Sequence, residues 1–563
     1  MQKLLIAVIL AFLFITCKQA EKKATPEQSV VAERIEIEKP KPPFVWEGAN
    51  IYFLLTDRFH NGDTSNDVNF ERTNETGVLR GFMGGDIKGI IQKINEGYFT
   101  ELGVNAIWFT PVVEQIHGDT DETTENTYGY HGYWTKDWTS LDPNFGTKED
   151  LKTLVKSAHS KDIRILMDVV LNHTGPMTPK DPVWPAEWVR EEPICQFTTY
   201  ENTTSCALVE NLPDVLTESD ASVKLPDALL AKWKAEGRLR QELDELELFF
   251  ERTGYSRSPR AYIIKWLVDY VGDYGIDGYR VDTVKHADEK SWAELYEQAS
   301  YAFNTWKKKN PDEVLDENQF YMMGEVYNYG ISGGREFDFG DQKVDYYNYG
   351  FNSLINFELK QDAKGDYETI FKKYNKLLNT KLKGKSVVNY LTSHDDGEPF
   401  DKAREHPIKT ANVLLLTPGV SQIYYGDESA RDLTIEGSVG DATLRSYMNW
   451  QEIDSLESTQ KILSHWKKLG QFRNNHPAVG AGKHKRLGKR PYVFSRTYNK
   501  GDIIDKVVVG LELPKGKKSL WVKGFFGDGT KLYDTYSATE VVVQNGKVTL
   551  ENDNDIALLE LAK

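Results

Sequence analysis

The sequence lacks an excess of basic charge, a hydrophobic run long enough to cross a bilayer, and any internal repeat. Its 85 acidic residues outnumber the 69 Lys and Arg residues, which gives a net charge of −16. Because nucleic-acid binding needs clustered Lys and Arg against phosphate, this balance argues against a nucleic-acid partner. An uncharged polymer would tolerate the acidity, and acidic side chains also supply oxygen ligands for hard cations such as calcium.

The longest apolar stretch near the N-terminus runs from Leu4 to Thr16. It is too short to span a bilayer and is typical of a signal peptide. Cys17 follows at once in a context that resembles a bacterial lipoprotein cleavage site, and the alternative is ordinary cleavage beside an unremarkable cysteine. We therefore expect a lipoprotein-type signal peptide at 1–17, a lipid anchor on Cys17 and a flexible tether at 18–43. This predicts an exported protein, attached to the membrane only by lipid, in the periplasm or at the outer-membrane surface of a Gram-negative bacterium.

Cysteine is scarce, with three residues in the chain. If Cys17 carries lipid, Cys195 and Cys206 remain as a pair, and export favours a disulfide between them. The alternative is two buried free thiols, which an oxidising compartment disfavours.

From residue 49 onward, short apolar runs alternate with helical patterns over most of the chain. Apolar runs typical of strands occur at 51–56, 106–110, 163–170, 278–281, 321–325, 387–392 and 420–425. Thr147-Lys-Glu-Asp150 predicts a capping box that opens a helix, and Ser258-Pro259 predicts the start of another helix. The alternation predicts a (β/α)8 TIM barrel built from residues 44–174 and 258–475.

Two segments depart from this alternation. Residues 175–257 span about eighty positions and hold both remaining cysteines, which is too long for a plain loop and predicts an inserted subdomain after the third strand. Residues 476–563 contain several β runs, with Asn545-Gly546 as a strong hairpin signal. They predict a C-terminal antiparallel β-sandwich domain.

The carboxyl ends of the predicted barrel strands carry acids and histidines. These are Asn172 and His173 after the third strand, Asp282 after the fourth, Glu325 after the fifth, and His394 and Asp395 after the seventh. An acid after a strand often only caps the next helix. However, barrel enzymes place their chemistry at these strand ends, so the repeated matches favour an active site.

This pattern suits the hydrolysis of an acetal. Two carboxyls about 5 to 5.5 Å apart can supply the nucleophile and the proton for the leaving oxygen, with retention of configuration. Arg280 lies two residues before Asp282, so both side chains point the same way on a strand, and the cation favours an ionised Asp282. Glu325 has no cation near it in the sequence and suits the acid role. His173 and His394 can donate hydrogen bonds to sugar hydroxyls.

Several segments resemble the signature regions of the α-amylase family, glycoside hydrolase family thirteen. They are Asp168-Val-Val-Leu-Asn-His173, Gly278-Tyr-Arg-Val-Asp-Thr-Val-Lys-His286, Gly324-Glu-Val-Tyr327 and Leu391-Thr-Ser-His-Asp395, with Leu212-Pro-Asp214 resembling a fifth region. The resemblance covers about residues 45–560 and looks strongest to bacterial periplasmic members. It implies that Asp282 is the nucleophile, Glu325 the acid/base, and Asp395 the group that stabilises the distorted sugar.

The resemblance also implies substrate-binding residues. The segment Tyr130-His131-Gly-Tyr133-Trp134 looks like the family's aromatic segment beside the cleavage point, where Tyr133 would stack on the reacting glucose and His131 would line the pocket. The alternative is that these aromatics only pack the barrel rim. Lys285 and His286 match a pair that grips the leaving chain in relatives that act on α-1,4 bonds.

Two calcium sites are implied in the same way. The first would be formed by Asn172 and Asp214, joined by the carbonyl of His286, between the barrel and the insertion. The second is similar to the N-terminal calcium loop of cyclodextrin glucanotransferases and comprises Asn61, Asp63, Asn66, Asp67, Gly84 and Asp86. Oxygen ligands clustered around glycine suit calcium, and the alternative for the loop is an Asx-rich turn.

Together these features predict a retaining, endo-acting α-amylase that hydrolyses α-1,4-glucosidic bonds in starch, glycogen or malto-oligosaccharides. Thr283 after the nucleophile and the Leu212-Pro-Asp214 version of region five favour α-1,4 over α-1,6 bonds. One alternative is an α-glucan transglycosylase of the same family, similar to cyclodextrin glucanotransferase or 4-α-glucanotransferase, which would share every catalytic residue. Another is a non-catalytic glucan-binding lipoprotein, against which the intact Asp282, Glu325 and Asp395 argue. The sequence predicts no oligomeric state.

Overall fold

The computed structural model describes residues 42–122 and 125–562 of the chain. The predicted signal peptide, the predicted anchor at Cys17 and the tether as far as residue 41 lie outside the described residues. Within the described residues, no helix is long and apolar enough to cross a membrane.

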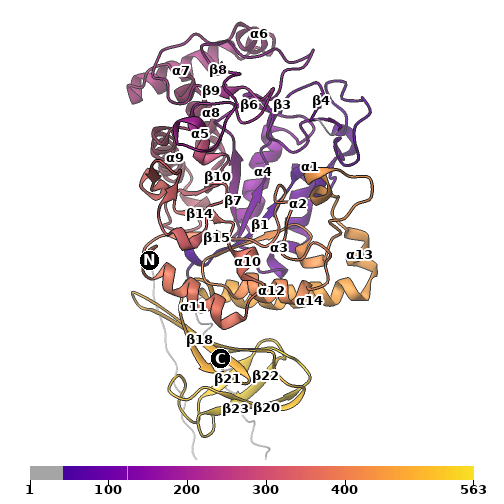
Figure 1. Ribbon diagram of the computed structural model, residues 1–563, viewed down its shortest axis with the longest axis vertical. Helices are drawn as coiled ribbons and strands as arrows, with labels where there is room; N and C mark the ends of the chain where they lie inside the picture. Colours follow the sequence, from indigo (N-terminus) through magenta and orange to yellow (C-terminus); the bar gives the residue numbers. More distant parts are fainter. Residues whose placement is uncertain (1–41, 123–124, 563) are drawn as a thin grey trace, which may run out of the picture. The chain divides into compact units, whose positions relative to one another are not determined.

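The centre of the described chain is a closed barrel of parallel strands (Figure 1). Its eight strands are β1 (Asn50–Leu54), β2 (Ala106–Phe109), β7 (Arg164–Val169), β10 (Gly278–Val281), β11 (Tyr321–Gly324), β14 (Ser353–Asn356), β15 (Ser386–Asn389) and β16 (Val420–Tyr424). Each strand pairs with its neighbours in chain order, and β16 closes the barrel on β1. The predicted (β/α)8 fold is therefore confirmed.

Helices connect these strands. The main ones are α2 (Ile87–Asn95), α4 (Lys148–His159), α8 (Pro259–Tyr274), α9 (Glu289–Lys309), α11 (Tyr367–Leu378), α12 (Pro407–Leu416) and α14 (Glu457–Asn475). Short helices and strands fill the connections: α1 (Thr56–Phe59), α3 (Tyr98–Glu101), β3 (Val113–Gln115), β4 (Thr120–Asp121), β5 (Asn126–Thr127), β6 (Thr135–Leu141), β12 (Phe337–Asp338), β13 (Lys343–Val344), α10 (Leu359–Asp362), α13 (Trp450–Ser455) and α15 (Pro477–Ala481).

The sequence signals for strands and helix starts rest on identifiable contacts. Every residue of β1, β7 and β10 is buried, as expected for parallel strands covered on both faces. Thr147 and Asp150 form the predicted capping box at the start of α4. The strand β14 was not predicted, because only Leu354 and Ile355 of its four residues are apolar.

The segment between β7 and α8, predicted as an inserted subdomain, contains short elements and two helices. They are β8 (Val189–Arg190), α5 (Glu201–Thr204), β9 (Asp214–Val215), α6 (Asp227–Ala235) and α7 (Leu239–Thr253). The predicted disulfide is confirmed, since Cys195 and Cys206 are bonded.

The C-terminal strands form a six-stranded antiparallel sheet and a two-stranded sheet. The strands are β17 (Lys483–Gly488), β18 (Tyr492–Lys500), β19 (Ile503–Leu511), β20 (Gly516–Trp521), β21 (Lys531–Asp534), β22 (Thr539–Val542), β23 (Lys547–Asn552) and β24 (Ala557–Leu561). Side chains of both sheets share one small core, including Val508 and Val548. The Asn545-Gly546 turn is present, with both residues at positive φ. The strands on either side of it separate, because β22 pairs with β21 and β23 pairs with β20.

Candidate active site

The predicted catalytic residues lie after the carboxyl ends of three barrel strands, β10, β11 and β15. Asp282 directly follows β10, Glu325 directly follows β11, and Asp395 lies in the loop after β15. Arg280 of β10 is in register with Asp168 of β7, so strand pairing alone places these two side chains side by side. The parallel barrel therefore brings together groups that are far apart in the sequence.

The guanidinium of Arg280 joins three carboxylates. Its Nη1 lies 2.5 Å from Asp282 Oδ1 and 3.0 Å from Asp168 Oδ1, and its Nη2 lies 3.2 Å from Glu325 Oε1. Arg280 is 1% exposed, so solvent screens these contacts little. Because Asp282 and Glu325 contact adjacent nitrogens of one planar group, their carboxylates are held next to each other.

The electrostatic environments of the carboxylates differ. Burial, reinforced by the negative charges of Asp282 and Asp395, raises the pKa of Glu325 well above its usual value despite Arg280. Burial alone would raise the pKa of Asp395, but His394, Arg280 and Arg445 more than offset it, and the pKa lies below its usual value. The Asp395 side chain is also 30% exposed. Glu325 is thus suited to hold a proton at neutral pH while Asp395 is ionised.

The backbone after Asp282 also contributes to the site. Thr283 adopts a φ of 50°, which is rare for a β-branched residue. In this conformation its N–H donates to Glu325 Oε2 at 3.1 Å. A strained residue directly after the predicted nucleophile therefore orients the predicted acid/base. No signal in the sequence predicts this conformation.

Asp168 is a buried member of the site that the sequence did not single out. Its Oδ2 accepts hydrogen bonds from the Tyr133 hydroxyl at 2.8 Å and from Trp108 Nε1 at 3.0 Å. Burial raises its pKa to about 7, with Arg280 opposing and Asp282 adding to the rise. Its position at the end of a strand within a matched signature region was the signal that could have identified it.

The predicted aromatic and histidine residues form one wall. The rings of Tyr133 and His394 stack with centroids 5.2 Å apart, and His131 lies 5.8 Å from Tyr133. His173 Nε2 lies 3.1 Å from the carbonyl oxygen of Tyr133. Trp134 is 6% exposed and packs edge-on against His131, so it supports this wall instead of presenting a free ring.

Burial also keeps the histidines of this wall neutral at pH 7. It lowers the pKa of His394 to about 4, and it lowers the pKa of His131 well below the usual value. The pKa of His173 is lowered in the same way. A neutral imidazole has one N–H donor and one acceptor nitrogen, which suits hydrogen bonding to sugar hydroxyls.

Lys285 and His286 lie on the turn after Asp282. Lys285 Nζ donates to the carbonyl oxygen of Tyr327 at 3.2 Å and lies near the rings of Tyr327 and Phe337, 5.5 Å from each centroid. His286 Nδ1 lies 3.0 Å from the carbonyl oxygen of Thr203 in the insertion. These contacts link the turn to both neighbouring loops.

Asn172 lies in the segment that follows β7, and this segment pairs with Asp214 and Val215 of the insertion. The backbone N–H of Val215 donates to the Asn172 carbonyl oxygen at 2.7 Å, and His173 forms a β-bridge with Asp214. The side-chain oxygens of Asn172 and Asp214 are buried. Asn172 Oδ1 has no hydrogen-bond donor, whereas Asp214 Oδ2 forms an ion pair with Arg190 Nε at 2.8 Å. Buried oxygens without donors fit a bound cation.

The predicted calcium ligands of the N-terminal loop fall into two groups, those without a hydrogen-bond donor and those that already have one. Asn61 and Asn66 have buried side-chain oxygens without a donor, and Asn61 Nδ2 donates to Asp67 Oδ1 at 2.8 Å. Asp63 Oδ2 instead accepts a hydrogen bond from Lys88 Nζ at 2.6 Å. Asp86 caps α2 and accepts the backbone N–H groups of Gly62, Asp63 and Gly89, with distances of 2.6 to 3.2 Å. Gly84 lies against this cluster, since an added Cβ would come within 2.7 Å of Asp67 Oδ1.

No group of three or more His, Cys, Asp and Glu side chains within the described residues could hold a metal ion. Both expected calcium sites depend instead on asparagine side chains and backbone carbonyls. The donor chemistry fits calcium best at Asn172 and Asp214, whereas Asp63 and Asp86 in the N-terminal loop already have other partners.

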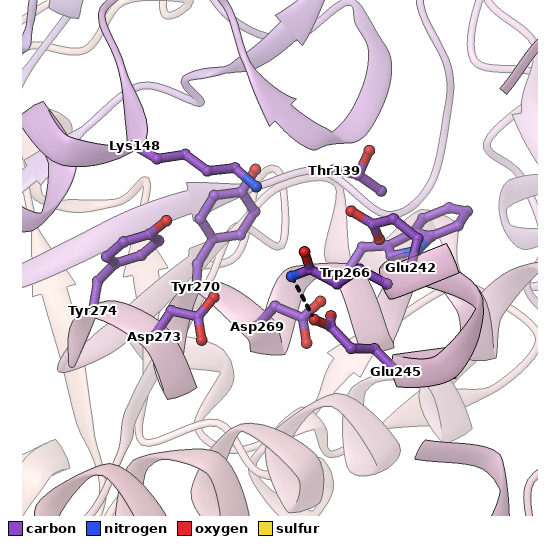
Figure 2. A pocket seen from close by; sticks show the side chains of 10 residues that line it. Thr139, Lys148, Glu242, Glu245, Trp266, Asp269, Tyr270, Asp273 and Tyr274 are labelled. Carbon is purple, nitrogen blue, oxygen red and sulfur yellow. Dashed lines mark hydrogen bonds between the residues drawn. The ribbon is translucent and has the colours of Figure 1, made fainter. Parts of the chain in front are cut away.

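A cavity of about 60 Å³ lies at α7 and α8 (Figure 2). Its acidic lining includes Glu242, Glu245 and Asp269. Lys265 Nζ donates to Glu245 at 2.9 Å and to Asp269 at 2.6 Å, and Arg238 pairs with Glu242. None of the predicted site residues lines this cavity, so it is separate from the carboxylates around Arg280.

Comparison with known proteins agrees with the fold and the signature regions. The family model for the α-amylase catalytic domain matches residues 53–182 and 255–434. The periplasmic α-amylase of Escherichia coli (strain K12) is 36% identical over 550 residues, covering 86% of this chain and 75% of that protein. A cyclomaltodextrin glucanotransferase of Thermoanaerobacterium thermosulfurigenes is 27% identical over 460 residues, covering 80% of this chain and 58% of that enzyme.

A solved structure also resembles the fold. The α-amylase from Geobacillus thermoleovorans, complexed with acarbose, matches with a TM-score of 0.64 and 23% identity, covering 92% of this chain and 100% of that chain. The two segments matched by the family model contain the barrel strands β2, β7, β10, β11, β14, β15 and β16. The chain therefore belongs to the α-amylase family.

Proposed function

We propose that this chain is a retaining α-amylase, which cleaves α-1,4-glucosidic bonds inside glucan chains. Asp282 is the nucleophile, Glu325 the acid/base and Asp395 the stabiliser of the distorted sugar. The observation that carries this proposal is the contact of Asp282 and Glu325 with one Arg280 guanidinium, combined with the raised pKa of Glu325. A close pair of carboxyls, one of them protonated, is the arrangement that retaining glycosidases need.

The reaction follows from these positions. In the first step Asp282 attacks the anomeric carbon while Glu325 donates its proton to the glycosidic oxygen, so the leaving chain departs with a free hydroxyl. In the second step Glu325 takes a proton from water, and the resulting hydroxide displaces Asp282 from the sugar. Arg280 holds the Asp282 carboxylate in place for the attack, since its Nη1 lies 2.5 Å from Asp282 Oδ1.

The wall beside the carboxylates supports sugar binding. The Tyr133 ring offers an apolar face held by its hydroxyl on Asp168, and the neutral His131, His173 and His394 offer hydrogen-bond donors. Ring stacking and hydrogen bonding to hydroxyls together would fix one glucose unit over Asp282.

Calcium is proposed as a structural ion held by Asn172, Asp214 and the His286 carbonyl. Its support is the set of buried side-chain oxygens on Asn172 and Asp214 at the junction of barrel and insertion, of which Asp214 Oδ2 also faces Arg190 Nε at 2.8 Å. Bound there, the ion would supply charge that stabilises the junction and take no part in bond cleavage. The N-terminal loop is proposed as a second site through Asn61, Asn66, Asp67 and the Gly84 carbonyl, with Asp63 and Asp86 as outer residues.

Export and lipid anchoring at Cys17 are proposed as well. The support is the apolar run from Leu4 to Thr16, the disulfide in the insertion, and the similarity to a periplasmic α-amylase. The mature N-terminus of protein from an exporting host tests the anchor, since a first residue other than Cys17 would contradict it.

Transglycosylation is the second candidate activity. Cyclomaltodextrin glucanotransferases are among the similar proteins, and the rings of Phe197 and Tyr327 near Lys285 are 52% and 41% exposed. Exposed rings beyond the cleavage point could bind an acceptor sugar in place of water. Product analysis over time on soluble starch and on maltoheptaose separates the activities. Hydrolysis gives short linear products only, and transfer gives products longer than the starting oligosaccharide or cyclic products.

A further inference from the structure

The disulfide loop, residues 195–206, extends from the insertion toward the predicted active site. The bond between Cys195 and Cys206 closes its base. Backbone hydrogen bonds fix that base, from Cys195 N–H to the Ala207 carbonyl and from Ala207 N–H to the Pro193 carbonyl, both at 2.9 Å. Between the cysteines, the only regular element is the four-residue helix α5. A helix this short is not stable without outside constraints.

The loop contacts the turn that follows Asp282. The Thr203 carbonyl oxygen lies 3.0 Å from His286 Nδ1. The Phe197 ring packs edge-on against His286 with a centroid distance of 5.6 Å, and Lys285 Nζ lies 6.0 Å from the Phe197 centroid. The Tyr200 hydroxyl donates to Glu289 Oε2 at 2.6 Å, near the start of α9. Two groups of the loop, Thr203 and Phe197, therefore contact the turn itself, and Tyr200 contacts the start of the helix that follows it.

The same loop contacts the β12–β13 hairpin on its other side. The Tyr200 N–H donates to Asp341 Oδ1 at 2.9 Å, and the rings of Tyr200 and Phe339 pack edge-on with centroids 5.2 Å apart. Phe337, from the same hairpin, lies 5.5 Å from Lys285 Nζ. Lys285 is thus surrounded by the disulfide loop, the hairpin and Tyr327, which follows Glu325 by two residues.

The backbone of the loop is strained at Phe197, so its conformation depends on the disulfide that closes the loop. Phe197 has a φ of 57°, an uncommon conformation for a bulky residue, and its ring is 52% exposed. Such conformations persist only when surrounding structure holds them. Without the disulfide, only backbone hydrogen bonds hold the base of the loop, so we expect the backbone at Phe197 to relax and the contacts of Thr203 and Phe197 to the turn to weaken together.

We propose that the Cys195–Cys206 disulfide is a positioning element for the part of the site that binds the glucan beyond the cleavage point. It holds Thr203 and Phe197 against His286 and Lys285 and leaves the carboxylates around Arg280 untouched. This inference rests on the proposed function, since it assigns a substrate-binding consequence to the same site.

The test compares two substrates that differ only beyond the cleavage point. Maltoheptaose places glucose units there, whereas α-maltotriosyl fluoride has fluoride as its leaving group and no sugar on that side. In the Cys195→Ser/Cys206→Ser variant, we expect kcat/KM on maltoheptaose to fall about 10-fold, mainly through KM, because misplaced binding groups weaken orientation. Turnover of the fluoride should stay within about 2-fold of wild type, because the carboxylates are unchanged.

Two further variants control the comparison. Glu201→Gln alters an exposed residue of the same loop whose side chain makes no hydrogen bond or ion pair among the described residues, and it should leave both activities unchanged. Tyr200→Phe keeps the disulfide and removes only the hydrogen bond to Glu289, so it should lower maltoheptaose turnover alone, by about 2- to 3-fold. This variant keeps the test valid if the double variant does not fold.

Equal losses on both substrates in the double variant, together with an unchanged Tyr200→Phe enzyme, would show a purely structural disulfide and overturn the inference. Unchanged turnover of maltoheptaose in the double variant would overturn it as well. Failure of the proposed function looks different, because wild-type enzyme would then cleave neither substrate, and the inference would fall with it.

Discussion

Replacement of Arg280 by methionine tests the electrostatic design of the site. Arg280 is buried and contacts Asp168, Asp282 and Glu325, so Arg280→Met leaves three buried carboxyl groups without their common cation. Methionine has similar volume and no charge, which separates the electrostatic effect from loss of packing. Arg280→Lys is the matched control, because it keeps one positive charge but loses the planar guanidinium that contacts all three carboxyl groups.

The magnitude follows from the partners that remain. Removing one partner of a buried ion pair costs about 3–5 kcal/mol. Asp168 retains Tyr133 and Trp108 as donors, and Glu325 retains the Thr283 N–H, so we expect the lower limit of about 3 kcal/mol at pH 7.5. With an unfolding entropy of about 2.1 cal/mol/K per residue, a chain of 563 residues loses about 2.5 °C in Tm for this change.

The loss should depend on pH in a defined direction. Burial already raises the folded-state pKa of Asp168 to about 7 and that of Glu325 well above its usual value, and loss of the cation raises both further. The folded variant therefore binds protons more tightly than the unfolded chain, so its stability relative to wild type recovers as pH falls below about 7. We expect a smaller Tm difference at pH 5 than at pH 7.5, and at least about 10²-fold lower kcat on starch at both.

The assay is thermal unfolding followed by circular dichroism, with kcat measured on soluble starch. Arg280→Lys should lose less stability than Arg280→Met. A Tm within error of wild type at pH 7.5, or an equal loss at both pH values, would refute the argument that Arg280 offsets the charge of these carboxylates.

Three further predictions concern other parts of the molecule. Exhaustive chelation should lower Tm, because a cation bound only by the folded state stabilises it. Asp214→Ala should reduce the Tm difference between chelated and calcium-loaded protein to the part that the N-terminal loop contributes. An unchanged Tm on chelation would contradict both calcium assignments. The kcat/KM for the α-1,4 bonds of maltotetraose should exceed that for the α-1,6 bond of panose, since a site shaped for the α-1,4 path misplaces the α-1,6 oxygen relative to Glu325. Equal or faster cleavage of that α-1,6 bond would exclude this specificity. Although burial opposes it, hydrogen bonds to Asp505 and Glu560 raise the pKa of His476 to about 9. The stability that protonated His476 provides is therefore present below about pH 6.5 and lost as pH rises through about 9, so His476→Gln should lower Tm at pH 6 and hardly at all at pH 10.

Local sequence signals predicted much of the fold. The capping box at Thr147 and the apolar runs of β1, β7 and β10 depend on neighbouring residues, which a sequence displays directly. The cysteine pair was predictable by elimination because only two cysteines remain after Cys17. β14 escaped prediction because burial by its neighbours, and not its own two apolar residues, makes it a strand.

The contacts within the site were harder to predict from the sequence than the fold. The sequence paired Arg280 with Asp282, but the contacts to Asp168 and Glu325 arise from strand register and barrel closure. The positive φ of Thr283 results from the packing of two strand ends and has no sequence signature. The strands flanking Asn545-Gly546 part into different sheets, because a turn signal fixes only the turn and not the later partners of each strand.

The central claim assigns the nucleophile to Asp282 and the acid/base to Glu325, and α-maltotriosyl fluoride tests it most directly. Fluoride leaves without a proton from the enzyme, so Glu325→Gln should still form the glycosyl-enzyme. It should then release one burst of fluoride per enzyme and gain the mass of one maltotriosyl group, because no base activates water for the second step. Asp282→Asn should show neither burst nor mass gain, and both variants should lose starch hydrolysis by several orders of magnitude. A mass gain in Asp282→Asn, or near-normal starch cleavage by either variant, would contradict the assignment.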